Sequence, residues 1–419
     1  MTTILTGDSR ERLKELEDES IDALVTDPPY LINFMGKDWD KENSPAGDSS
    51  FWEEVLRVMK PGAHGLVFGH SRQHHRVMTA LEDAGFEIRD CLMWFYGSGF
   101  PKSHNIGKSV TKLQGDSDWE GWGTALKPAY EPIILVRKPL EKKLTIAKNV
   151  LKHGVGGINI DASRIGTTED FSNVKPRKMM SNQGSVKTDD HDHTASDTWQ
   201  AAKDKLQNLG RFPANVLLSH HPDCKVVGEV EDTRSGGERT KTIFSEKEPV
   251  SGGEGTGGTM KATTIRKVYE CDDDCAVKIL DEQSGTSKSS KRGNKYNKKT
   301  ENREGYTPVQ SDYREDNTYG DNGGASRFFY CAKVGKKERN AGDVRNTHPT
   351  VKPIKLMTYL TKLITPPNGK VLDPFMGSGS TGMACAMEGF DFVGIDMDEE
   401  YVEISKTRID WARAQKEND

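Results

Sequence analysis

Apolar and polar positions follow two alternating patterns along the first 145 residues of the chain. Short apolar runs, typical of strands, are separated by segments in which apolar residues recur every three or four positions, as on one face of a helix. The strands predicted in this way cover residues 3–6, 21–26, 65–68, 91–96 and 132–136. Strands that alternate with helices predict a mostly parallel sheet with helices on both faces.

Two helices are predicted between these strands. The first follows Ser9 and carries Leu13 and Leu16, and the second carries the apolar positions of residues 51–59. The sequence Lys60-Pro61-Gly62 is expected to end the second helix, because proline and glycine both interrupt helical geometry.

The same α/β pattern returns near the end of the chain. A helix is predicted from Pro353, which suits a first helical turn, to the proline pair that begins at Pro366. Strands are predicted over residues 370–373 and 392–396, and a closing helix carries Tyr401. We therefore predict an α/β fold with a doubly wound, mostly parallel sheet.

Residues 146–325 differ in composition from both flanks. They are rich in Gly, Ser, Lys, Asp and Asn, and residues 251–258 are typical of a linker. Basic side chains gather around Tyr296 in residues 288–303, where a solvated loop and a DNA-contacting arm are both consistent with the composition. We predict an N-terminal half (1–145), a large loop-rich insertion (146–325) and a C-terminal half (326–419).

Composition and charge narrow the class of protein. The 419 residues carry a net charge of −5, so contact with DNA would have to come from local basic patches. No apolar run approaches the roughly 20 residues of a membrane helix, and the N-terminus lacks the pattern of a signal peptide. Six cysteines in a chain of this length do not suggest a disulfide scaffold. We expect no membrane association and a cytoplasmic location.

The sequence Asp27-Pro28-Pro29-Tyr30 ends the apolar run of residues 21–26. Proline cannot donate a hydrogen bond to a sheet and holds the preceding residue in extended geometry. The four residues therefore form a stiff corner that presents one acid, free carbonyl groups and one aromatic ring. A proline pair alone often marks only a strand-to-loop corner, so the rest of the chain has to decide its role.

A second motif, DPFMGSGSTG, occupies residues 373–382. Gly377 and Gly379 follow a predicted strand and open a helix of small residues, the context in which a backbone approaches a nucleotide-type ligand closely. Asp396 ends the next strand, where it could accept hydrogen bonds from ribose hydroxyls. Asp373 and Phe375 place an acid and an aromatic ring beside the loop, which favours S-adenosylmethionine over a dinucleotide.

With both motifs present, the chain resembles the amino-methylating DNA methyltransferases that use S-adenosylmethionine. The order of the motifs is similar to the β arrangement, and residues 100–105 and 125–132 are similar to stretches of a bacterial and phage subgroup. The resemblance implies a Rossmann-like methyltransferase sheet interrupted by an insertion that serves as target-recognition region. It also implies that Thr350 and Lys352, in the THPTVKP stretch, lie near the methionine end of the cofactor.

Further roles follow from the resemblance. Asp8 is assigned to the edge of the cofactor adenine, although a simple helix cap also fits that position. Tyr30 would stack on a flipped base, an interaction worth about 1–3 kcal/mol, while Asp27 and the Pro28 carbonyl would accept the two amine hydrogens. For residues 100–105 and 125–132, DNA-backbone contact or pocket lining is expected.

The resemblance favours N6-adenine methylation of DNA, and several alternatives stay open. They are N4-cytosine methylation, methylation of RNA or of protein glutamine, and a catalytically silent DNA-binding or zinc-binding protein. A pattern of proline followed by cysteine, which cytosine-C5 methylation would use, does not occur in the sequence. A homodimer and a restriction endonuclease partner are both compatible with the resemblance.

One pattern lies outside the catalytic motifs. His220, His221 and Cys224 lie in the middle region, and Cys271 and Cys275 follow further along it. Three thiolates and one histidine form a set that tetrahedral structural zinc sites use. Two unrelated cysteine pairs, one of them among aspartates on a solvated loop, would give the same pattern, so the sequence leaves a structural zinc and no metal both open.

Overall fold

The computed structural model describes most of the chain. The described residues are 1–32, 44–96, 103–165, 204–205, 208–221, 223–233, 263–273, 275–285, 287–288, 322–323, 325–333 and 336–418. Most of the linker-like and basic segments of the sequence, residues 251–258 and 289–303, lie outside them. No helix in the described part of the chain is both long and apolar enough to cross a membrane.

A nine-stranded sheet forms the centre of the molecule, in the order β1-β13-β12-β2-β3-β5-β4-β6-β11. Its strands are β1 (Thr2–Thr6), β2 (Ile21–Thr26), β3 (Met59–Phe68), β4 (Glu87–Phe95), β5 (Tyr130–Arg137), β6 (Val216–His220), β11 (Tyr330–Lys333), β12 (Lys370–Asp373) and β13 (Asp391–Asp396). Only β5 runs antiparallel to its neighbours β3 and β4, and the other pairings are parallel. The predicted mostly parallel α/β sheet is confirmed.

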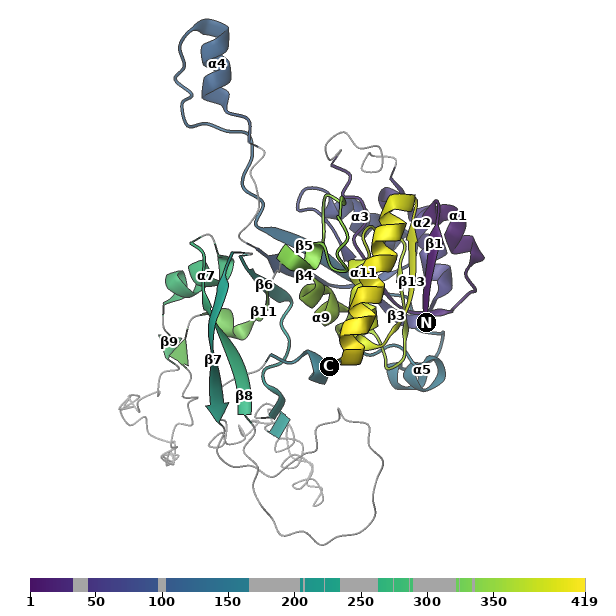
Figure 1. Cartoon of the computed structure of the whole chain (residues 1–419). Helices are drawn as coiled ribbons and strands as arrows, with labels where there is room; N and C mark the ends of the chain where they lie inside the picture. Colours follow the sequence, from purple (N-terminus) through teal and green to yellow (C-terminus); the bar gives the residue numbers. More distant parts are fainter. Residues whose placement is uncertain are drawn as a thin grey trace, which may run out of the picture.

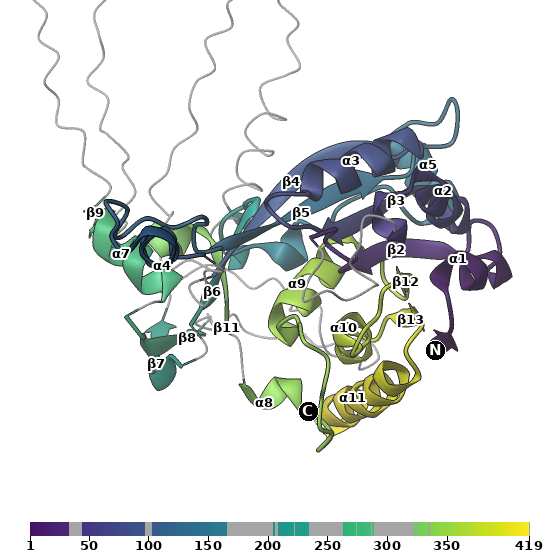
Figure 2. The ribbon, with the colours of Figure 1, turned by 90° about the horizontal axis from the view of Figure 1, so that it is seen from above.

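Helices cover both faces of this sheet (Figure 2). The helices on one face are α2 (Ser49–Val58), α3 (His74–Asp83) and α5 (Ile146–His153), and those on the other are α9 (Ile354–Ile364), α10 (Ser380–Glu388) and α11 (Glu399–Asn418). Alternate strand residues point to opposite faces. Val25 and Leu66 accordingly pack in the core under α9–α11, while Leu24 and Val67 pack in the core under α2 and α3.

Two expectations about local elements need correction, and one helix was missed. The segment after Ser9 forms only a short helix, α1 (Ser9–Arg12), which continues as a 3₁₀ turn. The helix α2 ends at Val58, and Lys60-Pro61-Gly62 lies inside β3 as an irregularity in its pairing with β2, with Gly62 at φ +85°. The helix α3 was not predicted, although Val77, Ala80 and Leu81 are buried at helical spacing.

The middle region contributes to the same sheet. The strand β6 pairs in parallel with β4, and β11 pairs with β6 at the sheet edge. A two-stranded ribbon of β7 (Lys225–Thr233) and β8 (Thr263–Glu270) and the helix α7 (Ala276–Ser284) lie beside that edge (Figure 1). The helix α4 (Ile106–Gln114) projects away from the body of the molecule (Figure 1).

Candidate active site

The two sequence motifs meet at the carboxyl ends of adjacent strands. The strands β2 and β12 pair directly, with Leu24 opposite Leu372. Because they are parallel, the residues that follow them leave the sheet at the same edge. The hydroxyl of Thr26, the last residue of β2, donates a hydrogen bond of 2.7 Å to the Asp373 carboxylate at the end of β12. The fold thus brings together segments that are 347 positions apart in the sequence.

The predicted corner follows β2 and is held from several sides. The Tyr30 hydroxyl lies 2.7 Å from Asp27 Oδ1 and 2.9 Å from Glu131 Oε2. Burial, together with the negative charge of Asp27, raises the Tyr30 pKa well above its usual value, so its hydroxyl keeps its proton. Leu31, directly after the corner, has φ +59°, a left-handed geometry that a non-glycine residue rarely adopts.

A buried cation completes this cluster. Lys352 Nζ lies 2.6 Å from Asp27 Oδ2, 3.2 Å from Glu131 Oε2 and 2.9 Å from the Tyr30 hydroxyl. Burial opposes its positive charge, but Asp27 and Glu131 outweigh burial and raise the Lys352 pKa. The ammonium also lies over the rings of Tyr30 and Phe68, at 5.3 and 4.9 Å from their centroids. The sequence placed Lys352 near the cofactor, and the structure places it against the proposed catalytic acid.

Glu131 is a site residue that the sequence did not single out. It lies near the start of β5, the one antiparallel strand of the sheet, opposite Trp94 of β4. The start of an antiparallel strand lies at the same edge as the ends of its neighbours. Glu131 therefore faces Tyr30 and Lys352, and it also accepts a hydrogen bond from the Tyr96 hydroxyl. The only sequence signal for Glu131 was its place in the stretch of residues 125–132. Pocket lining was one of the two roles expected for that stretch.

The glycine loop between β12 and α10 has the backbone geometry that the motif predicted. Gly377 and Gly379 have φ of +51° and +80°, and a Cβ at Gly377 would lie 2.8 Å from His348 Nε2. The Gly377 backbone N–H donates a hydrogen bond of 2.7 Å to Asp396 Oδ2 at the end of β13. Asp396 therefore fixes the loop, and its oxygens retain further acceptor capacity for a ligand.

Asp373 and Phe375, which the sequence assigned to cofactor binding, are both engaged within the protein. Asp373 accepts hydrogen bonds of 2.7 Å from Thr26 and from Thr381 of α10. Its burial raises the Asp373 pKa to about 6 in spite of these bonds. The Phe375 ring packs 5.1 Å from the ring of Phe51 on α2. Both residues thus hold the loop in place, and their contact with a cofactor stays a prediction.

The outer edge of the site holds two further predicted residues. Asp8 caps α1 by accepting a hydrogen bond of 2.9 Å from the Arg10 backbone, and the Arg10 guanidinium lowers the Asp8 pKa. The cap suggested by the sequence is therefore confirmed, and the contact of Asp8 with adenine stays a prediction. Thr350 is exposed, and its carbonyl accepts a hydrogen bond from the His348 ring, which lies over Gly377.

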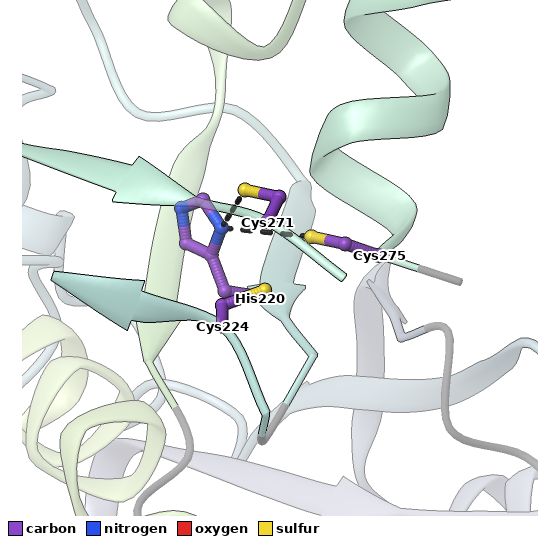
Figure 3. Close-up of side chains that lie close together, drawn as sticks. All are labelled: His220, Cys224, Cys271 and Cys275. Atoms are coloured by element: carbon purple, nitrogen blue, oxygen red, sulfur yellow. Dashed lines mark hydrogen bonds between the residues drawn. The ribbon is translucent and has the colours of Figure 1, made fainter. Parts of the chain in front are cut away.

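The histidine and cysteine pattern forms a separate cluster at the sheet edge (Figure 3). The side chains of His220, Cys224, Cys271 and Cys275 place their potential ligand atoms within 4.8 Å of one another. His221 is not part of this group and faces the carboxylates of Asp223 and Asp272 instead.

A family model for DNA methylases, of the N6 and N4 types, matches residues 21–407. Curated relatives include the type II methyltransferases M.HindIII and M.HinfI of Haemophilus influenzae, which are 30% and 31% identical to the chain over 201 and 171 residues. These matches cover 37% and 36% of this chain, and 64% and 43% of the two relatives. The chain thus spans less than two thirds of the length of either relative.

Solved structures of low sequence identity also match. The crystal structure of an M1.HpyAVI–SAM complex is 16% identical, with a TM-score of 0.38, and the match covers 97% of this chain and 100% of that chain. The cytosine-N4-specific PvuII DNA methyltransferase is 14% identical, with a TM-score of 0.42, and the match covers 97% of this chain and 86% of that chain.

Proposed function

Because the chain belongs to the DNA methylase family of the N6 and N4 types, we propose that it is a site-specific DNA methyltransferase that methylates the N6 amine of adenine. The strongest support is the contact between the two sequence motifs. The hydrogen bond between Thr26 and Asp373 joins the acidic corner to the glycine loop, so a base at Asp27 and a donor at Gly377 would lie at adjacent strand ends. Parallel sheets bind ligands at such carboxyl edges.

The proposed methyl donor is S-adenosylmethionine, whose sulfonium supplies an activated methyl group when it is bound. Its cradle would be the glycine loop, in which Gly377 and Gly379 hold positive φ at the N-terminus of α10. Asp396 holds the loop and would accept from ribose hydroxyls, with Asp8 at the adenine edge. His348, which lies against Gly377, would have to shift as the donor enters.

The acidic corner would orient the target amine. A base inside a duplex is out of reach, so the adenine has to be flipped into the site, where Tyr30 would stack on it. Asp27 and the Pro28 carbonyl would accept the two amine hydrogens and direct the nitrogen lone pair at the methyl group. Lys352 donates a hydrogen bond to Asp27 Oδ2, so the target amine would share this carboxylate with the ammonium. The transfer needs no covalent enzyme intermediate.

The choice of adenine over cytosine rests on the leading acid of the corner. N4-cytosine methylation uses the same amine chemistry and is the second candidate. In the family that the sequence resembles, a serine more often begins the corresponding motif of N4-cytosine enzymes, whereas this chain has Asp27. The target sequence would be read by residues of the middle region, and a homodimer or a restriction endonuclease partner stays a prediction of the resemblance.

Product analysis tests the proposal. DNA from cells that express the protein is digested to nucleosides, analysed by mass spectrometry, and sequenced for modified bases. We expect N6-methyladenine at one recurring sequence, and none with Asp27→Ala, which removes an acceptor but leaves the glycine loop intact. N4-methylcytosine as the only product would refute the adenine assignment. Methylation by Asp27→Ala at the wild-type rate would refute the role of the corner.

A further inference from the structure

We propose that His220, Cys224, Cys271 and Cys275 bind one structural zinc ion that fastens the β7–β8 ribbon and α7 to the edge of the main sheet. The four residues come from separate elements. His220 ends β6, Cys224 precedes β7, Cys271 follows β8, and Cys275 is the N-cap of α7 (Figure 3). The proposal is independent of the methyl-transfer chemistry.

The distances within the cluster match a tetrahedral site. His220 Nδ1 lies 3.5 Å from Cys271 Sγ and 3.6 Å from Cys275 Sγ. Zinc bonds of about 2.0–2.1 Å to nitrogen and about 2.3 Å to sulfur, at tetrahedral angles, place the two ligand atoms about 3.6 Å apart. The remaining ligand atom, Cys224 Sγ, lies within 4.8 Å of the other three. The two nitrogen–sulfur spacings are therefore those that a shared zinc ion requires, and Cys224 lies close enough to join them.

The surroundings also hold the ligands in position. The His220 ring stacks on Tyr269, with centroids 4.1 Å apart, and its Nδ1 faces the sulfur atoms. Backbone hydrogen bonds of 3.0 Å form tight turns before two ligands, from Cys224 to His221 and from Cys275 to Asp272. Neighbouring contacts of this kind fix the orientation of metal ligands.

The chemistry of the set favours zinc in a structural role. Three thiols and one imidazole are soft and borderline ligands that suit zinc and do not suit magnesium or calcium. Cys224 and Cys275 are 3% and 0% exposed, and the three cysteines are free thiols in the structure. Four protein ligands leave no open position for substrate, which distinguishes structural zinc sites from catalytic ones.

The local core explains why a metal would be useful there. Among the described residues, the apolar cluster that joins α7 to β6 contains four buried side chains, and two of these are the proposed ligands Cys224 and Cys275. So small a core contributes little stability by itself, and binding of a metal ion adds directly to the free energy of folding. Without the ion, the ribbon would be joined to the catalytic sheet only weakly.

Metal analysis of the full chain, purified without a metal-affinity tag, tests the site. We expect about one zinc ion per chain by mass spectrometry of the elements, and loss of zinc in Cys271→Ser and His220→Ala. The neighbouring His221→Ala is the matched control and should keep the ion, as should Cys91→Ser on β4. Loss of zinc from His221→Ala but not from His220→Ala would overturn the assignment.

A second measurement does not depend on whether the variants fold. Cobalt(II) alone, added to wild-type protein stripped of metal under reducing conditions, should give the intense visible absorption of tetrahedral cobalt and thiolate charge-transfer bands at one equivalent. Limited proteolysis should then show that the metal protects the β7–β8 ribbon. A stripped protein that takes up no cobalt, resists protease as before and keeps its melting temperature would rule the site out.

Discussion

The carboxylates of Asp27 and Asp373 lie at the ends of neighbouring strands but have different bonding partners. Asp373 is buried and bonded to the neutral hydroxyls of Thr26 and Thr381, and burial raises its pKa to about 6. Asp27 is paired with the Lys352 ammonium instead, at 2.6 Å. The partner of Asp27 is thus a charged N–H donor, whereas the side-chain partners of Asp373 are hydroxyl groups. Asp27 is thus suited to accept the hydrogens of an amine, and Asp373 holds the two motifs together.

The pKa of Asp373 predicts a pH-dependent stability difference. The folded pKa of about 6 lies above the unfolded value of 3.8, so the wild-type protein loses stability as the pH rises and the buried acid ionises. Asp373→Asn does not titrate. Between pH 5 and 7 its free energy of unfolding should rise relative to wild type by roughly 1.4 kcal/mol. Thermal denaturation of both ligand-free proteins at the two pH values measures this change.

An exposed acid supplies the control for this prediction. Asp116→Asn, on the loop after α4, should show no such change relative to wild type between the same pH values. If the stability difference between Asp373→Asn and wild type stays constant from pH 5 to 7, Asp373 does not ionise in that range.

At the scale of elements, the sequence predicted the helices and strands whose pattern lies within their own residues. Apolar runs located β2 and β12, helical spacing of apolar residues located α9, and the glycine motif located α10. The direction of β5 and the position of β6 in the sheet had no local signal, since both depend on partners far away in the sequence. For the same reason the motifs gave Asp27 and the glycine loop but not Glu131.

The third glycine of the loop motif acts through packing between elements. A Cβ at Gly382 on α10 would lie 2.4 Å from Ile409 Cδ1 on α11 and 2.7 Å from Phe392 Cε1 on β13. We expect Gly382→Val to lower the free energy of unfolding by about 1–3 kcal/mol, because an added side chain overpacks this contact. Chemical denaturation measures the loss. Gly157→Ala, where a Cβ meets nothing within 4 Å, should be nearly neutral, and an equal loss in both variants would contradict the packing account.

At the scale of the whole molecule, the two ends of the chain build one site. The C-terminal strands β12 and β13 lie between β1 and β2 in the sheet, so Figure 1 shows the first and last colours of the chain side by side. Lys352, from the C-terminal part of the chain, contacts Asp27, which lies 325 positions earlier in the sequence. It also contacts Glu131 on the antiparallel strand β5. The assembled fold, rather than any single segment, therefore defines the charge balance of the site.

This charge balance predicts that Lys352 stabilises the molecule as well as the site. Lys352→Met leaves Asp27 and Glu131 beside each other without their buried cation; breaking a fully buried pair costs about 3–5 kcal/mol, and these two carboxylates are partly buried, so we expect a smaller loss. We expect a lower melting temperature together with reduced methyl transfer. Lys142→Met, an exposed lysine on the loop after β5, should change neither.

The double variant Lys352→Met/Glu131→Gln separates charge from packing. Removing the negative charge of Glu131 as well should restore part of the stability that Lys352→Met loses, because one unpaired, partly buried carboxylate is then absent. Methyl transfer should not recover, since Asp27 still lacks the ammonium that orients it. Melting temperatures and initial rates of the single and double variants give the coupling between the two residues. A double variant that loses the sum of the two single effects would show that Lys352 acts through packing alone.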